Sequence, residues 1–246
     1  MAVWRMSSAV SGRRPRFAPT PGFTLLALLL AALFVRLGFW QWHRGVNREE
    51  EWARFARGAD RLESLGTHEV TQLPLFQRIS VAGRLDGAHQ FLLDNRSHQG
   101  RPGYEVLTPL LRAGLPALLV NRGWVPFSGT RARLPPVGIA AAGEVTLSGR
   151  IGTLPSPGLA SGRSAPAREG SWPKLTSYPD MEQLQTALGS PLAARILLLD
   201  PAADFGYLRD WQAPGISPLR HFSYAIQWWT FALVVLATWG LMSRRP

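Results

Sequence analysis

Two short segments near opposite ends of the sequence carry side chains that could together hold a flat, charged ligand. They supply one imidazole, two guanidinium groups and three aromatic rings, on Arg36, Trp40, Arg44, His221, Tyr224 and Trp228. The first three residues follow at four-residue steps and the last three at spacings of three and seven, so a helix would place each set on nearly one face. An imidazole can bind a metal axially, guanidinium groups pair with carboxylates, and aromatic rings stack on flat molecules. This equipment suits a planar, anionic, metal-containing ligand such as haem.

A structural interpretation of the same residues stays open. Tryptophan and tyrosine gather at membrane interfaces as aromatic belts, and an arginine near a helix end can extend its charged head into water. Ionisable groups within spanning helices are usually functional, which adds weight to the ligand interpretation, and both interpretations stay open at this point.

Both segments adjoin apolar stretches that are long enough to cross a membrane. The first stretch covers residues 20–42 and the second covers residues 218–242. At about 1.5 Å per residue, each helix would span the ~30 Å of a hydrocarbon core. Bulky residues follow the first stretch, which argues against a cleaved signal peptide. Ser217 as the N-cap and Pro218 at the first helical position predict a defined start for the second helix.

The charges outside these helices predict the orientation of the chain. The two tails, residues 1–19 and 243–246, contain no acidic residue and hold the arginines Arg5, Arg13, Arg14, Arg16, Arg244 and Arg245. Because cytoplasmic segments are rich in arginine and lysine, we expect both termini in the cytoplasm and residues 43–217 outside it. All 16 acidic residues lie between the helices, so the formal charge of +11 mainly reflects topology and gives no support for nucleic-acid binding. The excess of arginine over lysine is typical of GC-rich bacteria, and the expected location is therefore a bacterial inner membrane.

The composition also excludes several kinds of site. The chain has no cysteine, so it can form neither disulfides nor thiolate metal sites nor a covalent c-type haem attachment. We find no glycine-rich phosphate loop, no nucleophile elbow and no pair of histidines at metal-binding spacing. An enzyme is therefore not expected.

Residues 43–217 have the size of one ordinary domain. Alternating hydrophobicity predicts strands at residues 78–85, 90–94, 104–112, 116–125, 144–151 and 195–200. Helical patterns predict a continuation of the first anchor over residues 46–65 and a short helix over residues 181–188, with Asp180 and Gln183 as its capping box and Gly189 at its end. Residues 152–173 are rich in Gly, Pro, Ser and Ala, which predicts a flexible insertion. The expected fold is a membrane-anchored α+β protein, in which two transmembrane helices flank an extracytoplasmic antiparallel sheet or small barrel.

Two segments within this domain are expected to serve its structure. Their residues of interest are Asn121, Arg122, Gly123, Trp124 and Pro126 in NRGWVP, and Gly103 and Tyr104 at the start of GYEVLTPL. Gly123 permits an unusual backbone angle, and Pro126 stops strand pairing. We expect Trp124 to pack under the sheet and Arg122 to bond loop carbonyls.

At these motifs the sequence resembles the Surfeit locus protein 1 family of cytochrome oxidase assembly factors. The resemblance covers most of the chain and rests on LGFWQWHR, FQRISVAGRL, DNRSHQGRPGYEVLTPL, LLVNRGWVP, VTLSGR and HFSYAIQWW, with NRGWVP the most specific. It implies an inner-membrane protein with two helices that assists the maturation of haem-copper terminal oxidases, around the insertion of haem a.

The resemblance also implies a site and partners. It implies His221 as the iron ligand, with Tyr224, Gln227 and Trp228 completing the same motif. From the first helix, Arg36, Trp40, Gln41 and Arg44 are added to these as candidate binding residues. The implied cofactor is non-covalently bound haem a, and the implied partners are subunit I of cytochrome c oxidase, haem a synthase and membrane lipid. The alternative is a membrane-anchored scaffold that stabilises oxidase subunits without touching the cofactor.

Overall fold

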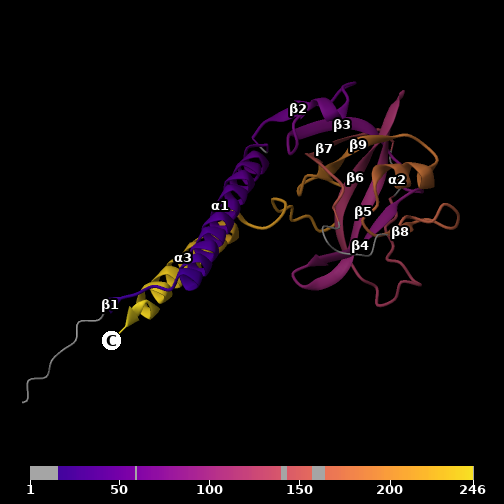
Figure 1. Ribbon diagram of the computed structural model, residues 1–246. Coiled ribbons are helices and arrows are strands. Elements are labelled where there is room, and N and C mark those ends of the chain that lie inside the picture. The colour runs from indigo at the N-terminus through magenta and orange to yellow at the C-terminus, as the bar shows by residue number, and fades with distance from the viewer. Residues whose placement is uncertain (1–15, 59, 140–142, 157–163, 246) are drawn as a thin grey trace, which may run out of the picture. The chain divides into compact units, whose positions relative to one another are not determined.

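The computed structural model describes residues 16–58, 60–139, 143–156 and 164–245. Contacts divide the chain into two compact units, one formed by Met1–Glu51 with Pro214–Pro246 and the other by Trp52–Ala213. The first unit is a helix pair and the second is a β domain (Figure 1). Most of the basic segment 1–19, and residues 157–163 of the expected flexible insertion, lie outside the described residues.

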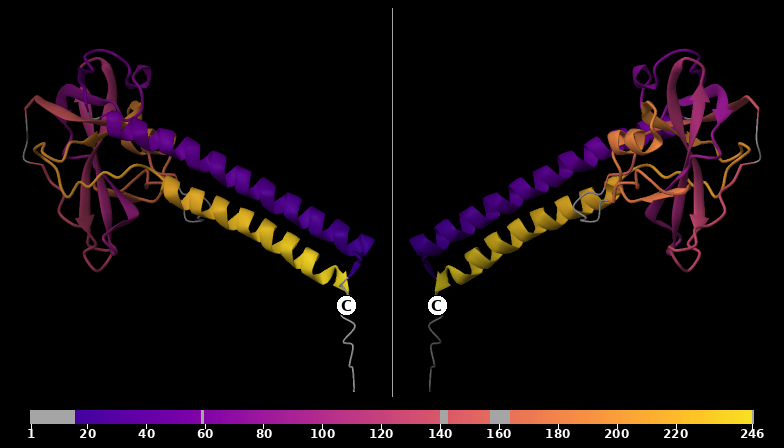
Figure 2. Two further views of the ribbon diagram at one scale, coloured as in Figure 1. Left: turned by 90° about the vertical axis from the view of Figure 1, so that its left-hand side faces the viewer. Right: turned by 90° about the vertical axis from the view of Figure 1, so that its right-hand side faces the viewer.

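The helix pair consists of α1 (Pro21–Arg57) and α3 (Pro218–Met242), which lie side by side in Figure 2. α3 has the bounds that the sequence predicts, with Ser217 as the N-cap and a proline at the start of the helix. α1 runs without a break from the predicted anchor into the segment that follows it. The predicted helical continuation is thus correct as far as Arg57.

The predicted helix over residues 46–65 is wrong after Arg57. The Gly58 amide donates to the Arg54 carbonyl at 2.9 Å, and a Cβ at Gly58 would lie only 2.2 Å from the carbonyl oxygen of Phe76. Leu62–Ser64 then forms strand β2, which pairs in parallel with residues 78–80. Pairing with the sheet therefore replaces the last helical turns that the sequence pattern suggests.

Small residues bring α1 and α3 close together. The buried residues of the two helices are all glycine or alanine, namely Ala27, Ala31, Gly38, Gly45, Ala225 and Ala232. A Cβ at Gly38 would lie 2.2 Å from Trp229 Nε1, and a Cβ at Gly45 would lie 2.5 Å from Phe222 Cε1. Each glycine thus leaves room for one aromatic ring of the facing helix, as is common where membrane helices pack.

A second set of contacts joins the start of α1 to the end of α3. Trp239 donates its indole N–H to the Thr24 hydroxyl at 3.0 Å. Strands β1 (Arg16–Phe17) and β10 (Arg244–Arg245) pair antiparallel beside it. The chain segments flanking the two helices are thereby joined.

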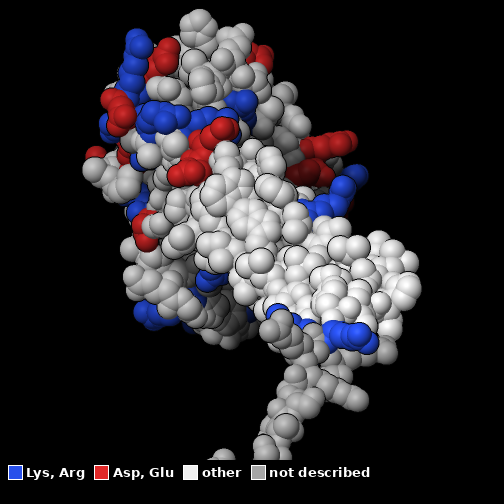
Figure 3. All heavy atoms as spheres, turned by 60° about the vertical axis from the view of Figure 1, so that its left-hand side comes forward, with Lys and Arg blue, Asp and Glu red and all other residues white. Residues whose placement is uncertain are grey.

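The outer surface of the helix pair is apolar and exposed. Only 17% of the most hydrophobic window of α1 is buried, and only 11% of that of α3. Figure 3 shows few charged side chains on this face of the pair, whereas they gather on the β domain. A core helix of a soluble protein would be mostly buried, so these helices fit the hydrocarbon of a membrane.

The β domain is built on one sheet of eight strands among the described residues, in the order β2-β3-β7-β9-β6-β5-β4-β8. The strands after β2 are β3 (Arg78–Leu85), β4 (Phe91–His98), β5 (Arg101–Arg112), β6 (Leu115–Pro126), β7 (Val145–Gly152), β8 (Lys174–Thr176) and β9 (Leu192–Leu199). β5 also pairs with β3, which closes β3, β7, β9, β6 and β5 into a barrel. This confirms the small barrel, with a mixed sheet because β6 pairs in parallel with β9.

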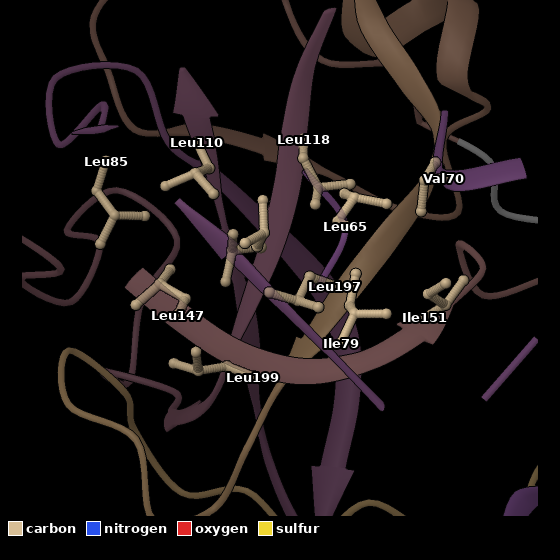
Figure 4. Close-up of a cluster of buried hydrophobic side chains, with 12 residues drawn as sticks. Leu65, Val70, Ile79, Leu85, Leu110, Leu118, Leu147, Ile151, Leu197 and Leu199 are labelled. Atoms are coloured by element: carbon tan, nitrogen blue, oxygen red, sulfur yellow. The ribbon is translucent and has the colours of Figure 1, made fainter. Parts of the chain in front are cut away.

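Aliphatic side chains fill the barrel. The cluster comprises Leu65, Val70, Ile79, Val81, Leu85, Leu110, Leu118, Val120, Leu147, Ile151, Leu197 and Leu199. Figure 4 shows its labelled members converging from several strands. A second cluster joins strand residues to α2 (Met181–Leu188), a helix with the predicted bounds. Its capping box between Asp180 and Gln183 and its left-handed end at Gly189 confirm the predicted start and stop.

Gly123 in β6 combines a positive φ with a backbone oxygen that leaves no room for a side chain. Its φ is +107°, and a Cβ there would lie 2.6 Å from the carbonyl oxygen of Leu208. That oxygen accepts the Trp124 amide hydrogen at 2.7 Å, so it cannot move away without losing a hydrogen bond. The sequence-based expectation of an unusual backbone angle at Gly123 is confirmed.

We predict that Gly123→Ala destabilises the β domain by roughly 2–4 kcal/mol, because backbone strain of about 1–3 kcal/mol adds to the clash. Thermal unfolding of the full chain in detergent, followed by near-ultraviolet circular dichroism, would measure the loss. Gly114→Ala is the matched control, because Gly114 also has a positive φ (+70°) but nothing lies within 4 Å of its Cβ position. Equal losses in the two variants would contradict the proposed clash.

Candidate ligand-binding site

A hollow of about 370 Å³ lies on the helix pair where α3 begins. Its lining comes from one face of α1 and from the chain around the start of α3, and comprises Trp40, Gln41, Arg44, Asn47, Arg48, Glu51, Ile216 and His221. The sequence predicted that the first anchor and the last helix would bring polar and aromatic residues together. Trp40, Gln41, Arg44 and His221 do lie around this one hollow.

His221 is oriented by a hydrogen bond between the two helices. Its Nδ1 lies 2.9 Å from the side-chain oxygen of Gln41. An amide oxygen only accepts hydrogen bonds, so Nδ1 carries the proton and donates it. In the neutral ring the lone pair then remains on Nε2, the form in which histidine binds a metal.

The two arginines of the hollow have different environments. Arg48 pairs with Glu51, one turn further along α1, and lies 3.4 Å from the Pro214 carbonyl oxygen. Arg44 stacks on Trp40, with its guanidinium carbon 5.2 Å from the ring centroid. No carboxylate of the described residues lies within ion-pair distance of Arg44. Arg44 is therefore the cation of this hollow that remains available to an anionic ligand.

Several predicted site residues lie elsewhere on the helix pair. Arg36 lines a separate hollow of about 440 Å³ together with Leu37, Phe39, Trp40 and His43. Tyr224, Gln227 and Trp228 line neither hollow. The Trp228 ring instead stacks on Phe34 of α1, with centroids 5.7 Å apart. Trp228 therefore contributes to helix packing.

Four lining residues were not among the sequence-based candidates. Asn47, Arg48 and Glu51 continue the face of α1 that carries Trp40 and Arg44, beyond the predicted end of the anchor. The helical spacing of these residues was the available signal. Ile216, by contrast, precedes α3 in a segment without periodicity, so its place at the hollow has no sequence signal.

The NRGWVP segment lies in the barrel, where its arginine is almost completely buried. Arg122 is 3% exposed and donates to the carbonyl oxygens of Phe205 (2.5 Å) and Val137 (3.2 Å) and to the side-chain oxygen of Gln90 (2.8 Å). Burial lowers the pKa of Arg122 below its usual value. The guanidinium also stacks on Tyr207, at 4.8 Å from the ring centroid. This bonding to loop carbonyls is the structural role that the sequence suggested.

Neighbouring residues of both structural segments support the same strand end. Asn121 donates to Glu105 at 2.7 Å and accepts the Gly123 amide at 3.1 Å. Gly103 leaves room for the Trp124 ring, since a Cβ there would lie 2.4 Å from Trp124 Cε2.

The last residue of NRGWVP and the tyrosine of GYEVLTPL lie on the paired strands β6 and β5. Pro126 is the last residue of β6 and stands opposite Gly103 in β5. Tyr104 is fully buried, and its hydroxyl has no hydrogen-bond partner among the described residues. Burial raises the pKa of Tyr104.

In the described part of the chain, no three His, Cys, Asp or Glu side chains are grouped so as to hold a metal ion.

Comparison with known proteins connects the helix pair and the barrel to one family. Residues 28–233 match the model of the SURF1 family, the family that the sequence motifs resemble. The chain is also 29% identical over 241 residues to uncharacterized SURF1-like proteins of Mycobacterium bovis and Mycobacterium tuberculosis. Each alignment covers 93% of this chain and 85% of the relative. The matched segment includes all eight residues of the hollow.

Proposed function

Because the chain belongs to the SURF1 family, we propose that it assists the assembly of cytochrome c oxidase by holding haem a for insertion into catalytic subunit I. The single observation that carries the haem role is the His221 ring, which lines the hollow and whose Nδ1 is bonded to Gln41, while its Nε2 has no hydrogen-bond partner among the described residues. The proposal assigns no catalytic step to the chain.

The donor set of the hollow fits haem. Bound haem would supply an iron that accepts an axial imidazole nitrogen, which His221 can provide. Arg44 would pair with a propionate, and Trp40 offers a flat apolar face beside it. Arg36, the other arginine that the sequence predicted for the site, does not line the hollow.

The volume of the hollow, about 370 Å³, lies within the ~300–1,000 Å³ of ordinary ligand pockets. The partners of this proposal are subunit I, haem a synthase as the donor, and the surrounding lipid.

Complementation would test the function. In a bacterium that lacks its own family member, expression of the chain should restore the haem a content of the terminal oxidase, measured in membrane spectra. A chain that reaches the membrane at normal abundance and leaves the haem a content unchanged would overturn the proposal. If His221→Ala restored the oxidase fully, the scaffold function would replace the haem-carrying one.

The proposed location is the bacterial inner membrane, with both termini in the cytoplasm and the β domain outside. We predict that a reporter enzyme active only outside the cytoplasm is active when inserted near Gly162. The same reporter should be silent when fused after Pro246. Matched immunoblots would control for abundance, and the reverse pattern of activity would refute this orientation.

A further inference from the structure

We infer that Gln41 is a positioning residue, which selects the tautomer of His221 in which Nε2 can bind a metal. This inference rests on the proposed haem role of His221. The observation that supports the inference is the 2.9 Å hydrogen bond between His221 Nδ1 and Gln41 Oε1, which joins α3 to α1. Among the described residues, neither side chain has another hydrogen-bond partner.

The chemistry follows from the donor and acceptor capacity of each group. A neutral imidazole has one N–H, which can sit on either nitrogen. The Gln41 oxygen accepts only, so it favours the proton on Nδ1 and leaves the Nε2 lone pair free. Without that acceptor, a fraction of the chains would carry the proton on Nε2, where it blocks coordination. The nearby Arg44 and Arg48 are donors and cannot replace the acceptor.

The close packing of the two helices determines which side chains Gln41 can contact. It lies between Gly38 and Gly45, the two positions where α1 admits an aromatic ring of α3. His221 directly precedes Phe222, the ring that packs at Gly45. The close approach of the helices therefore brings the amide within hydrogen-bond distance of the imidazole and limits rotation of the ring.

Three substitutions of Gln41 separate the acceptor from the bulk of the side chain. Gln41→Met keeps the length and removes the acceptor, Gln41→Glu keeps an acceptor, and Gln41→Lys offers only donors. Gln227→Met is the matched control, because Gln227 is exposed on α3 and lines neither hollow.

The first readout needs no haem. In the full chain, purified in detergent and labelled with ¹⁵N-histidine, nitrogen shifts report which ring nitrogen carries the proton, and His221→Ala assigns the signals. We expect the wild type, Gln41→Glu and Gln227→Met to show His221 protonated on Nδ1. Gln41→Met should show a mixture, and Gln41→Lys should show the proton mainly on Nε2.

The second readout is the binding of added haem a. Partners that orient a metal-binding histidine typically contribute 10–100-fold in metal affinity, so Gln41→Met should lose roughly that factor and Gln41→Lys at least as much. Gln41→Glu should bind like the wild type but with a lower reduction potential, because a carboxylate makes the ligand more basic.

The outcomes distinguish this inference from the proposed function. If Gln41→Met left both the tautomer and the haem affinity unchanged, the positioning role would be wrong even if haem bound well. If the tautomer changed as expected but the wild type bound no haem a, the positioning role would stand and the haem-carrying function would fall.

Discussion

His221→Ala is expected to abolish the retention of haem a while leaving the chain folded and inserted in the membrane. The substitution removes the only imidazole of the hollow, and the loss of an axial ligand should exceed the roughly 10–100-fold that its hydrogen-bond partners contribute. Folding should change little, because His221 is only partly buried and, among the described residues, bonds a single side chain. Haem a per purified chain, with the absorption spectrum, measures the effect.

His43→Ala is the control for this experiment. His43 lies on the same helix pair, and its Nδ1 is 2.7 Å from the Phe39 carbonyl oxygen, but it lines the neighbouring hollow. Its loss should leave haem retention unchanged. Replacement of Tyr224 or Trp228 should have a milder effect than His221→Ala, since neither lines the hollow of His221. An unchanged haem stoichiometry in His221→Ala would remove the ligand role from this residue.

Gly38→Leu is expected to push α1 and α3 apart and, as a result, to abolish the binding of haem a in the hollow. A Cβ at Gly38 would lie 2.2, 2.4 and 2.8 Å from three atoms of the Trp229 ring, so a larger side chain forces α3 away. Overpacking of a close contact typically costs about 1–3 kcal/mol, and the separation would also withdraw Gln41 from His221. Thermal denaturation in detergent and haem a stoichiometry should both fall.

The remote glycines of the same unit provide matched controls. A Cβ at Gly22 or Gly240 meets nothing within 4 Å, so leucine at either position adds apolar surface without a clash. These variants should keep the stability and the haem content of the wild type. A Gly38→Leu chain that behaves like them would show that close helix packing is not required.

Much of the fold could be predicted from local sequence patterns. α2 has the predicted bounds because Asp180 and Gln183 form a capping box at its start and Gly189 ends it. α3 has them because a long apolar run begins at Pro218, although the Ser217 side chain makes no capping hydrogen bond. The parallel partners β2 and β8 could not be predicted, since each has three residues, too few for an alternating pattern to be read. The closure of β3 on β5 and the parallel pairing of β6 with β9 join distant segments, which no local pattern encodes.

The candidate site could be predicted only in part, because residues spaced four apart on a helix do not stay on the same face. An α-helix turns by about 100° per residue, so each four-residue step from Arg36 to Trp40 to Arg44 advances by ~40°. Arg36 and Arg44 are thus about 80° apart and line different hollows. Tyr224, three residues after His221, is likewise ~60° away. The partnership of Gln41 with His221 depends on the register between two distant helices and required the structure.

The central claim is tested most directly by the haem a content of the full chain, purified from membranes of a cell that also makes haem a. We expect haem a to copurify with the wild-type chain at close to one haem per chain. Its absorption spectrum should be lost in His221→Ala and kept in His43→Ala. A wild-type chain that purifies free of haem a, while it restores the oxidase of a deletion strain, would contradict the claim.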